Sequence, residues 1–268
     1  AKEAAELGLD MLVLDDGWFG VRDDDNSGLG DWNVNEKKLG CSLRELVECV
    51  NKMGLQFGIW VEPEMISEDS DLYRTHPDWA MAVPGREPNR SRNQLVLDLS
   101  RAEVRQYIKN VIDTLIQSAN ITYIKWDMNR SMDNLYSAAE PDAPQGVVRH
   151  KYMLGLYEIL EYIHQTYPEV LVEGCSGGGG RFDAGMLYYT PQIWCSDNTD
   201  AVERLGIHYG TSFGYPMSSV AAHVSECPNE QNRRVTPFQT RGICAMQGAF
   251  GYEMDLSAMP SEEKECAK

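Results

Sequence analysis

The chain has 268 residues, of which 43% are hydrophobic. It contains 24 Lys and Arg residues against 41 Asp and Glu residues, so its formal net charge is −17. This charge argues against nucleic acid or an anionic membrane surface as a partner. The length allows one large core, and the hydrophobic content predicts a soluble globular protein, not a disordered acidic tail.

Seven cysteines are spread along the chain without CxxC or metal-ligand spacing. We therefore expect reduced thiols in a cytoplasmic, bacterial protein, with no metal and no cofactor. No apolar run reaches the roughly 18 residues that a membrane-spanning helix needs. Residues 1–8 have the pattern of a helix already under way, without an initiator Met, so we expect a chain cut from a longer protein.

The first half of the chain alternates between strand and helix patterns. An apolar run at 11–14 predicts a buried strand that ends at two acids, and Ser42 with Glu45 forms a capping box that opens a helix through residue 53. Residues 55–61 predict the next strand. The stretch 66–94 predicts a long functional loop, and 95–97 a short extended segment. A second capping box, Ser100 with Glu103, opens a helix over 104–115 that leads to a strand before Asp127.

The second half continues this alternation. Helices are predicted over 147–167 and 201–209 and after Thr236-Pro237, and strands over 169–173, 192–195, 217–224 and 249–254. About seven strand–helix units imply an α/β fold with a parallel sheet covered by helices. A TIM (β/α)8 barrel has eight units. Because the chain begins inside a helix, we expect an incomplete barrel with the first strand missing and strands 2 to 8 present, and a single partial catalytic domain over 1–268.

Polar residues gather where these strands end, and in a barrel such ends open onto one face. They are Asp15, Asp16, Trp60, Glu62, Lys125, Asp127, Asn129, Cys175, Asp197 and Asp200. Carboxylates accept hydrogen bonds from hydroxyl groups, and an exposed indole can stack on the apolar face of a sugar. This composition favours a neutral, hydroxyl-rich ligand.

Two of these carboxylates, Asp127 and Asp197, are the pair that we favour for cleavage of a glycosidic bond. Lys125 and Asn129 lie two residues either side of Asp127 and share its face of an extended chain, where Lys125 would favour the ionised acid. A retaining enzyme needs the two carboxyl groups about 5 to 5.5 Å apart, and an inverting one roughly 6.5 to 9.5 Å apart. Asp200 is the alternative acid, although it would also suit the N-terminus of a helix.

Four motifs then identify a family by resemblance. Residues 14–20 (LDDGWFG), 123–130 (YIKWDMNR), 173–183 (EGCSGGGGRFD) and 195–200 (CSDNTD) resemble the catalytic barrel of family 36 glycoside hydrolases, the microbial α-galactosidases. The resemblance implies a retaining mechanism with Asp127 as nucleophile and Asp197 as acid/base. It also implies a galactose subsite lined by Asp15, Asp16, Trp60, Arg92, Lys125, Asn129, Cys175 and Gly177.

The resemblance implies further properties of the whole protein. Terminal α-galactosides of the melibiose and raffinose type would be its substrates, Asp15 and Asp16 would select the sugar O4 and O6 hydroxyls, and the protein would be a homotetramer. Family members also carry a first barrel strand and flanking β-domains that these residues do not include, so we expect activity to require the longer protein. Residues 95–97 would form a loop strand outside the barrel wall.

Other functions fit parts of the same sequence. The glycosyl-enzyme could pass its sugar to another sugar, as in an α-galactosyltransferase of the raffinose-synthase type, or the enzyme could be an α-N-acetylgalactosaminidase. A lectin-like module would keep the hydroxyl-binding carboxylates without an acid/base pair. Residues 174–178 match the GxSxG pattern of a serine esterase, which requires the serine to lie on a strand-to-helix turn.

Overall fold

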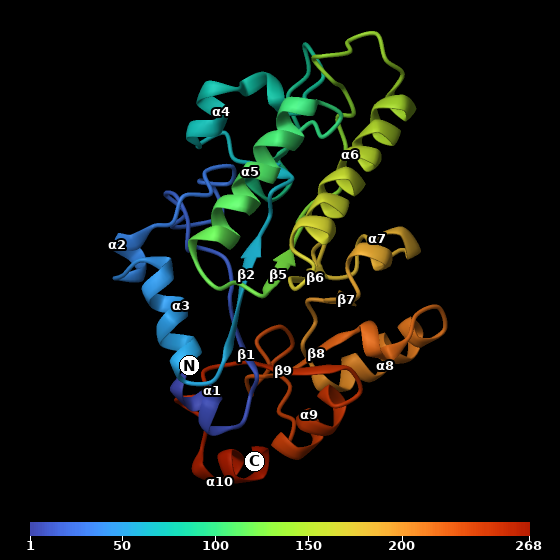
Figure 1. The fold of residues 1–268 in the computed structure, drawn as a ribbon. Coiled ribbons are helices and arrows are strands. Elements are labelled where there is room, and N and C mark those ends of the chain that lie inside the picture. The colour runs from blue at the N-terminus through green and yellow to red at the C-terminus, as the bar shows by residue number, and fades with distance from the viewer. The chain divides into compact units, whose positions relative to one another are not determined.

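A computed structural model describes residues 1–268, which form an α/β protein (Figure 1). The chain divides into two compact units. The central unit consists of Val13–Cys49 and Phe57–Leu171, and the terminal unit consists of Ala1–Leu12, Val50–Gln56 and Val172–Lys268. Each unit is described by itself below.

The central unit is organised around two parallel strands, β2 (Gln56–Val61) and β5 (Tyr123–Trp126). Residues 57–61 of β2 are all buried, as expected for a continuous apolar run in a parallel sheet. The register pairs Val61 with Trp126, and the backbone NH of Asp127 donates to the Val61 carbonyl at 2.8 Å. Asp127 therefore lies where the strand ends, as the sequence predicted.

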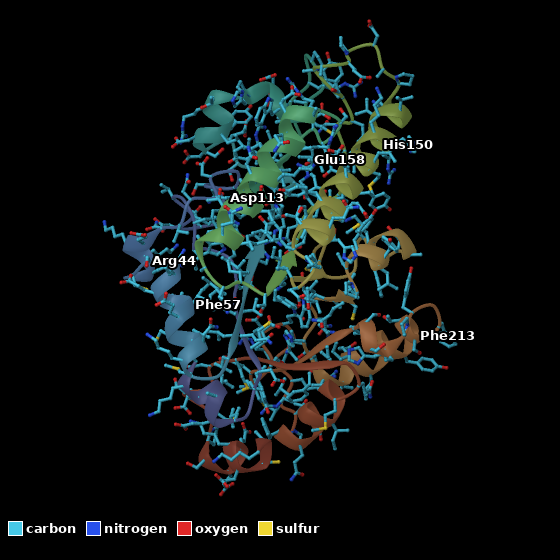
Figure 2. All side chains as sticks on the ribbon, viewed as in Figure 1. Arg44, Phe57, Asp113, His150, Glu158 and Phe213 are labelled. Atoms are coloured by element: carbon cyan, nitrogen blue, oxygen red, sulfur yellow. The ribbon has the colours of Figure 1, made fainter.

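Two long helices, α5 (Ala102–Ser118) and α6 (Gln145–Thr166), lie side by side in this unit (Figure 1). Each buries an apolar stripe, which includes Ile108 of α5 and Ile159 of α6. Glu158 of α6, labelled in Figure 2, lies 2.8 Å from Arg105 and 2.7 Å from Lys109 of α5. The predicted helices are thus confirmed, and ion pairs link their outer faces.

The two predicted capping boxes have different outcomes. Helix α3 (Leu43–Lys52) begins with reciprocal bonds, because Ser42 N donates to Glu45 Oε2 at 2.9 Å and Glu45 N donates to Ser42 Oγ at 3.2 Å. The box at Ser100 is wrong: the Ser100 hydroxyl donates to Asp98 Oδ1 at 2.6 Å, and α5 has no side-chain cap. A charged carboxylate two residues away is the stronger partner for that hydroxyl.

The predicted loop over 66–94 contains local structure. Strands β3 (Met65–Ile66) and β4 (Leu95–Val96) pair in antiparallel fashion, which confirms 95–97 as a loop strand separate from the parallel sheet. Helix α4 (Asp71–Thr75) and the 3-10 turns η1 (Pro77–Trp79) and η2 (Ser91–Asn93) lie between them. Strand β1 (Met11–Leu14) and helix α2 (Glu36–Leu39) precede this region.

The terminal unit continues the alternation with parallel strands. Strand β6 (Leu171–Gly174) pairs with β7 (Gln192–Ile193), Ile193 forms a parallel bridge to Val220, and β8 (Ala221–Ser225) pairs with β9 (Ala249–Glu253). The predicted segment 217–224 divides into the 3-10 turn η3 (Met217–Ser219) and β8. The helices are α1 (Lys2–Glu6), α7 (Ala184–Tyr189), α8 (Ala201–Ser212), α9 (Phe238–Ala245) and α10 (Ser261–Ala267).

These pairings confirm an α/β fold with parallel strands, while the closed barrel, the missing first strand and the single domain stay predictions. None of the helices combines the length and apolar character that would let it cross a membrane.

Candidate functional site

The carboxylate of Asp127 is buried and held by three donors of the central unit. Only 5% of the residue is exposed. Its Oδ2 accepts from Trp60 Nε1 at 3.1 Å and from Asn129 Nδ2 at 2.8 Å, and its Oδ1 accepts from Met128 N at 2.8 Å. These bonds fix both oxygens in one orientation, which suits a carboxylate that must meet a bound atom along a defined direction.

Asn129 connects Asp127 to two further groups. Its side-chain Oδ1 accepts from Arg92 Nη1 at 3.1 Å, and its backbone NH donates a short hydrogen bond to Glu62 Oε1. The position of Asn129 on the same side as Asp127 confirms the predicted alternation. Arg92 has a φ of 54°, in the left-handed region that residues other than Gly rarely adopt.

Each of the adjacent acids Asp15 and Asp16 has its own cation. Lys125 Nζ lies 2.9 Å from Asp15 Oδ2. Arg22, which is 4% exposed, binds both Asp16 oxygens through Nε and Nη2 at distances from 2.8 to 3.2 Å. The lysine predicted beside Asp127 therefore forms an ion pair with Asp15, and the sequence analysis missed Arg22.

Trp60 is 2% exposed, so the prediction of an indole exposed for stacking is wrong for this residue. Its ring packs near Phe19 and Trp32, with centroid distances of 6.2 Å to each. Large aromatic side chains usually bury most of their area. The polar edge of the ring, through Nε1, is what reaches Asp127.

Glu62 is a second buried acid close to Asp127. It is 1% exposed, and its Oε1 accepts from Gln94 Nε2 at 2.7 Å as well as from the Asn129 backbone. Burial, and secondarily the negative charge of Asp127, raise the pKa of Glu62 to about 7. The sequence places Glu62 at a strand end but does not show that this acid, unlike Asp15, lies inside the protein.

In the terminal unit, Asp197 is exposed and its carboxylate is oriented by a tryptophan. Trp194 Nε1 donates to Asp197 Oδ1 at 3.0 Å, and the guanidinium of Arg204 stacks 4.2 Å from the centroid of the Trp194 ring. Arg204, 4% exposed, also donates to the backbone carbonyls of Ser196 and Asn198, which flank Asp197. One buried arginine thus fixes the segment that carries Asp197.

Asp200 has a structural role instead. It is 1% exposed, caps the N-terminus of α8 by accepting from Glu203 N at 2.9 Å, and pairs with Arg234 at 2.5 Å. This confirms the interpretation of Asp200 as a helix N-terminal acid.

Glycines of the 177–180 run pack closely against the segment that carries Asp197. A Cβ on Gly178 (φ 80°) would lie 2.8 Å from Ser196 Cα, and one on Gly179 would lie 2.5 Å from the Cys195 carbonyl oxygen. These glycines therefore permit the chain to approach itself closely. Cys175 is buried in a cluster with Trp194 and Ala221, and the neighbouring Gly177 has a φ of 53°.

The GxSxG pattern lacks the geometry of a nucleophile elbow. Ser176 lies in a turn in which its NH donates to the Gly178 carbonyl at 2.8 Å, and the next helix, α7, begins only at Ala184. A nucleophile elbow requires the serine to lie directly between a strand and a helix. The structure therefore gives no support to the serine esterase.

The fold and these clusters define an α/β protein with oriented carboxylates at the ends of parallel strands. The model of the family described as Melibiase matches residues 1–268. The chain belongs to the melibiase family.

The relatives are longer proteins. The chain is 59% identical over 265 residues to the bifunctional alpha-galactosidase/sucrose kinase AgaSK of Mediterraneibacter gnavus, covering 99% of this chain and 28% of the relative. It is 56% identical over 268 residues to alpha-galactosidase AgaA of Geobacillus stearothermophilus, covering 100% of this chain and 37% of the relative. A crystal structure of an AgaA variant in complex with raffinose aligns with a TM-score of 0.97 at 55% identity, over 99% of this chain and 37% of that one.

Proposed function

We propose that this chain is the catalytic part of an α-galactosidase that removes terminal α-D-galactosyl residues from oligosaccharides of the melibiose and raffinose type. The observation that carries the proposal is the Asp127 carboxylate, which is buried at the end of a parallel strand and oriented by three donors. Membership in the melibiase family and the raffinose complex of a close relative support the choice of sugar.

The proposed reaction is a double displacement. One oxygen of Asp127 attacks the anomeric carbon of galactose while the glycosidic C–O bond breaks, and Asp197 gives its proton to the leaving oxygen. Water then attacks the same carbon, Asp197 takes a proton from that water, and the Asp127 ester opens. The mechanism requires the two carboxyl groups about 5 to 5.5 Å apart. The exposure of Asp197 supports its role, because an acid/base must exchange protons with the leaving group and water.

Asp15 and Asp16 are proposed to accept hydrogen bonds from the galactose O4 and O6 hydroxyls. Their cations, Lys125 and Arg22, allow two adjacent carboxylates to coexist in one small region. A sugar without hydroxyl groups at these positions would lose the hydrogen bonds to the two carboxylates and would bind more weakly, which gives selectivity for galactose.

The rest of the proposed subsite surrounds these groups. Arg92 and Asn129 would contact the sugar beside Asp127, and Cys175 and Gly177 would line the region near the 2-hydroxyl. Trp60 would act through its indole NH and ring edge, since its faces are packed against other aromatic rings.

We also infer that the strands of both units belong to one (β/α)8 barrel, as its second to eighth strands. The parallel pairs in each unit and the TM-score of 0.97 to the AgaA structure support this inference. The chain spans only about a third of that relative, and the activity is proposed for the full-length protein. A cytoplasmic homotetramer is proposed from the family resemblance, and light scattering on the full-length protein would measure its mass.

Hydrolysis of nitrophenyl α-galactoside by the full-length protein tests the function. Asp127→Ala and Asp197→Ala should each lower kcat/KM by about a thousandfold or more. Asp113→Asn is the matched control, because Asp113 of α5 accepts from Tyr162 and Tyr167, none of which belongs to the proposed site, and the change should leave turnover within about twofold. NMR of the first product should show α-galactose, as retention requires. Undiminished turnover in Asp127→Ala would refute the proposal.

A further inference from the structure

Glu62 is a buried acid that shares Asn129 with the proposed nucleophile, and the mechanism above does not use it. Two donors bind one of its oxygens: Gln94 Nε2 at 2.7 Å and the backbone NH of Asn129 reach Oε1. The Asn129 side chain then donates to Asp127 Oδ2 at 2.8 Å. One residue thus connects the two carboxyl groups, with its backbone on Glu62 and its amide on Asp127.

We propose that Glu62 is a positioning residue for Asp127, which holds Asn129 in place and exchanges a proton as Asp127 loses and regains its charge. This inference rests on the proposed function. The geometry supports the positioning part directly, because a buried acceptor fixes the backbone of Asn129 at the residue whose amide orients the nucleophile.

The charged groups around Glu62 come from several elements. Asp127 follows β5, Arg92 lies on η2 and binds Asn129 Oδ1 at 3.1 Å, and Arg130 donates to the carbonyl of Gln94 at 2.6 Å. Glu64, two residues further along, accepts from Trp126 Nε1 at 2.7 Å and from the Tyr152 hydroxyl at 2.5 Å. Among these groups it is the charge of Asp127 that, after burial, raises the pKa of Glu62.

The proton exchange follows from this coupling. When Asp127 forms its ester with the anomeric carbon, its negative charge disappears and no longer disfavours an ionised Glu62. The pKa of Glu62 then falls, and at neutral pH Glu62 releases a proton to the solvent. When water opens the ester, Asp127 regains its charge and Glu62 takes a proton back. The cycle therefore closes without net gain or loss of a proton at Glu62.

The structure offers two informative substitutions at this position. Glu62→Gln keeps an oxygen that can accept from both Gln94 and Asn129 but cannot ionise, whereas Glu62→Ala removes both hydrogen bonds. Glu64→Gln is the matched control, since Glu64 is equally buried in the same loop and its carboxylate is held by Trp126 and Tyr152.

The experiment measures kcat and KM of the full-length protein against nitrophenyl α-galactoside across pH 5 to 9 (about two units either side of the pKa of about 7 raised by burial). Glu62→Ala should lose about tenfold to a hundredfold in kcat at every pH, because Asp127 is less well oriented. Glu62→Gln should match the wild type at acidic pH, where both are uncharged at this position. As pH rises through 7, kcat of Glu62→Gln should fall below that of the wild type. The deficit should be about tenfold for each unit by which the charge of Asp127 raises the pKa of Glu62.

A second readout does not depend on activity. NMR of isotope-labelled glutamate carboxyl groups should show one signal that titrates near pH 7, that is absent in Glu62→Gln, and that moves to lower pH in Asp127→Asn. Glu64→Gln should retain this signal and the wild-type pH profile of kcat/KM.

The outcomes separate the two proposals. A wild-type protein without turnover would refute the proposed function. The NMR titration would then still test the coupling between Glu62 and Asp127. An active wild type whose Glu62→Ala variant keeps its kcat, or whose Glu62→Gln variant keeps the same pH profile, would overturn the inference. So would a titration near pH 7 that is unaffected by Asp127→Asn.

Discussion

The buried Glu62 makes the stability of the fold depend on pH in a calculable way. Its pKa rises from 4.5 in the unfolded chain to about 7 in the folded protein. Between these values the folded state binds more protons than the unfolded state, so stability falls as pH increases, and above about pH 7 the whole penalty is present. A shift of this size corresponds to about 3 kcal/mol, at about 1.4 kcal/mol for each pKa unit.

Glu62→Gln isolates this contribution. The variant cannot ionise at this position, so its free energy of unfolding relative to the wild type should increase by about 3 kcal/mol between pH 4.5 and 7.5. Urea unfolding of both proteins over this range measures the difference, and the contributions of the other acids cancel in the comparison. Equal pH dependence of the two proteins would show that Glu62 is ionised without cost in the fold and would refute the reasoning.

Three further substitutions, one of them a control, test the packing of the central unit by thermal and urea unfolding. Gly155→Ala in α6 should destabilise by about 1 to 3 kcal/mol, because its Cβ would lie 2.1 Å from the Leu99 carbonyl oxygen; Gly146→Ala in the same helix has open space and should be neutral or stabilise by up to about 1 kcal/mol. Equal effects of the two substitutions on stability would contradict the close contact between α6 and the backbone at Leu99. Tyr152→Phe removes the hydroxyl that donates to Glu64 at 2.5 Å, and should cost about 1 to 3 kcal/mol. An unchanged unfolding midpoint would mean that this bond does not stabilise the protein.

Local patterns predicted the elements that carry the site. The strand before Asp127 was predicted because Ile121, Tyr123 and Trp126 form a short β-prone, apolar run, and Asn129 because side chains alternate along an extended chain. Both are properties of neighbouring residues. The capping box at Ser100 failed for an equally local reason, since Asp98 offers its hydroxyl a charged acceptor.

Features that depend on distant parts of the chain could not be predicted in this way. Lys125 pairs with Asp15, 110 positions away, so its partner is set by the fold and not by its neighbours. The burial of Glu62 depends on the elements that cover the end of β2, about which composition says nothing. Arg22 and Arg204 were missed because an arginine in a sequence is most often a solvated surface residue.

The two cation–carboxylate pairs beside the proposed sugar subsite differ in their contact with solvent, and this makes them respond differently to ionic strength. The Lys125–Asp15 pair is open to water, with 60% of the Asp15 side chain exposed, so dissolved ions can screen it. The Arg22 side chain is 4% exposed and the Asp16 side chain 34%, so dissolved ions screen their bidentate hydrogen bonds less strongly. Added salt therefore weakens the Lys125–Asp15 pair more than the Arg22–Asp16 pair, so the two adjacent acids respond differently to ionic strength.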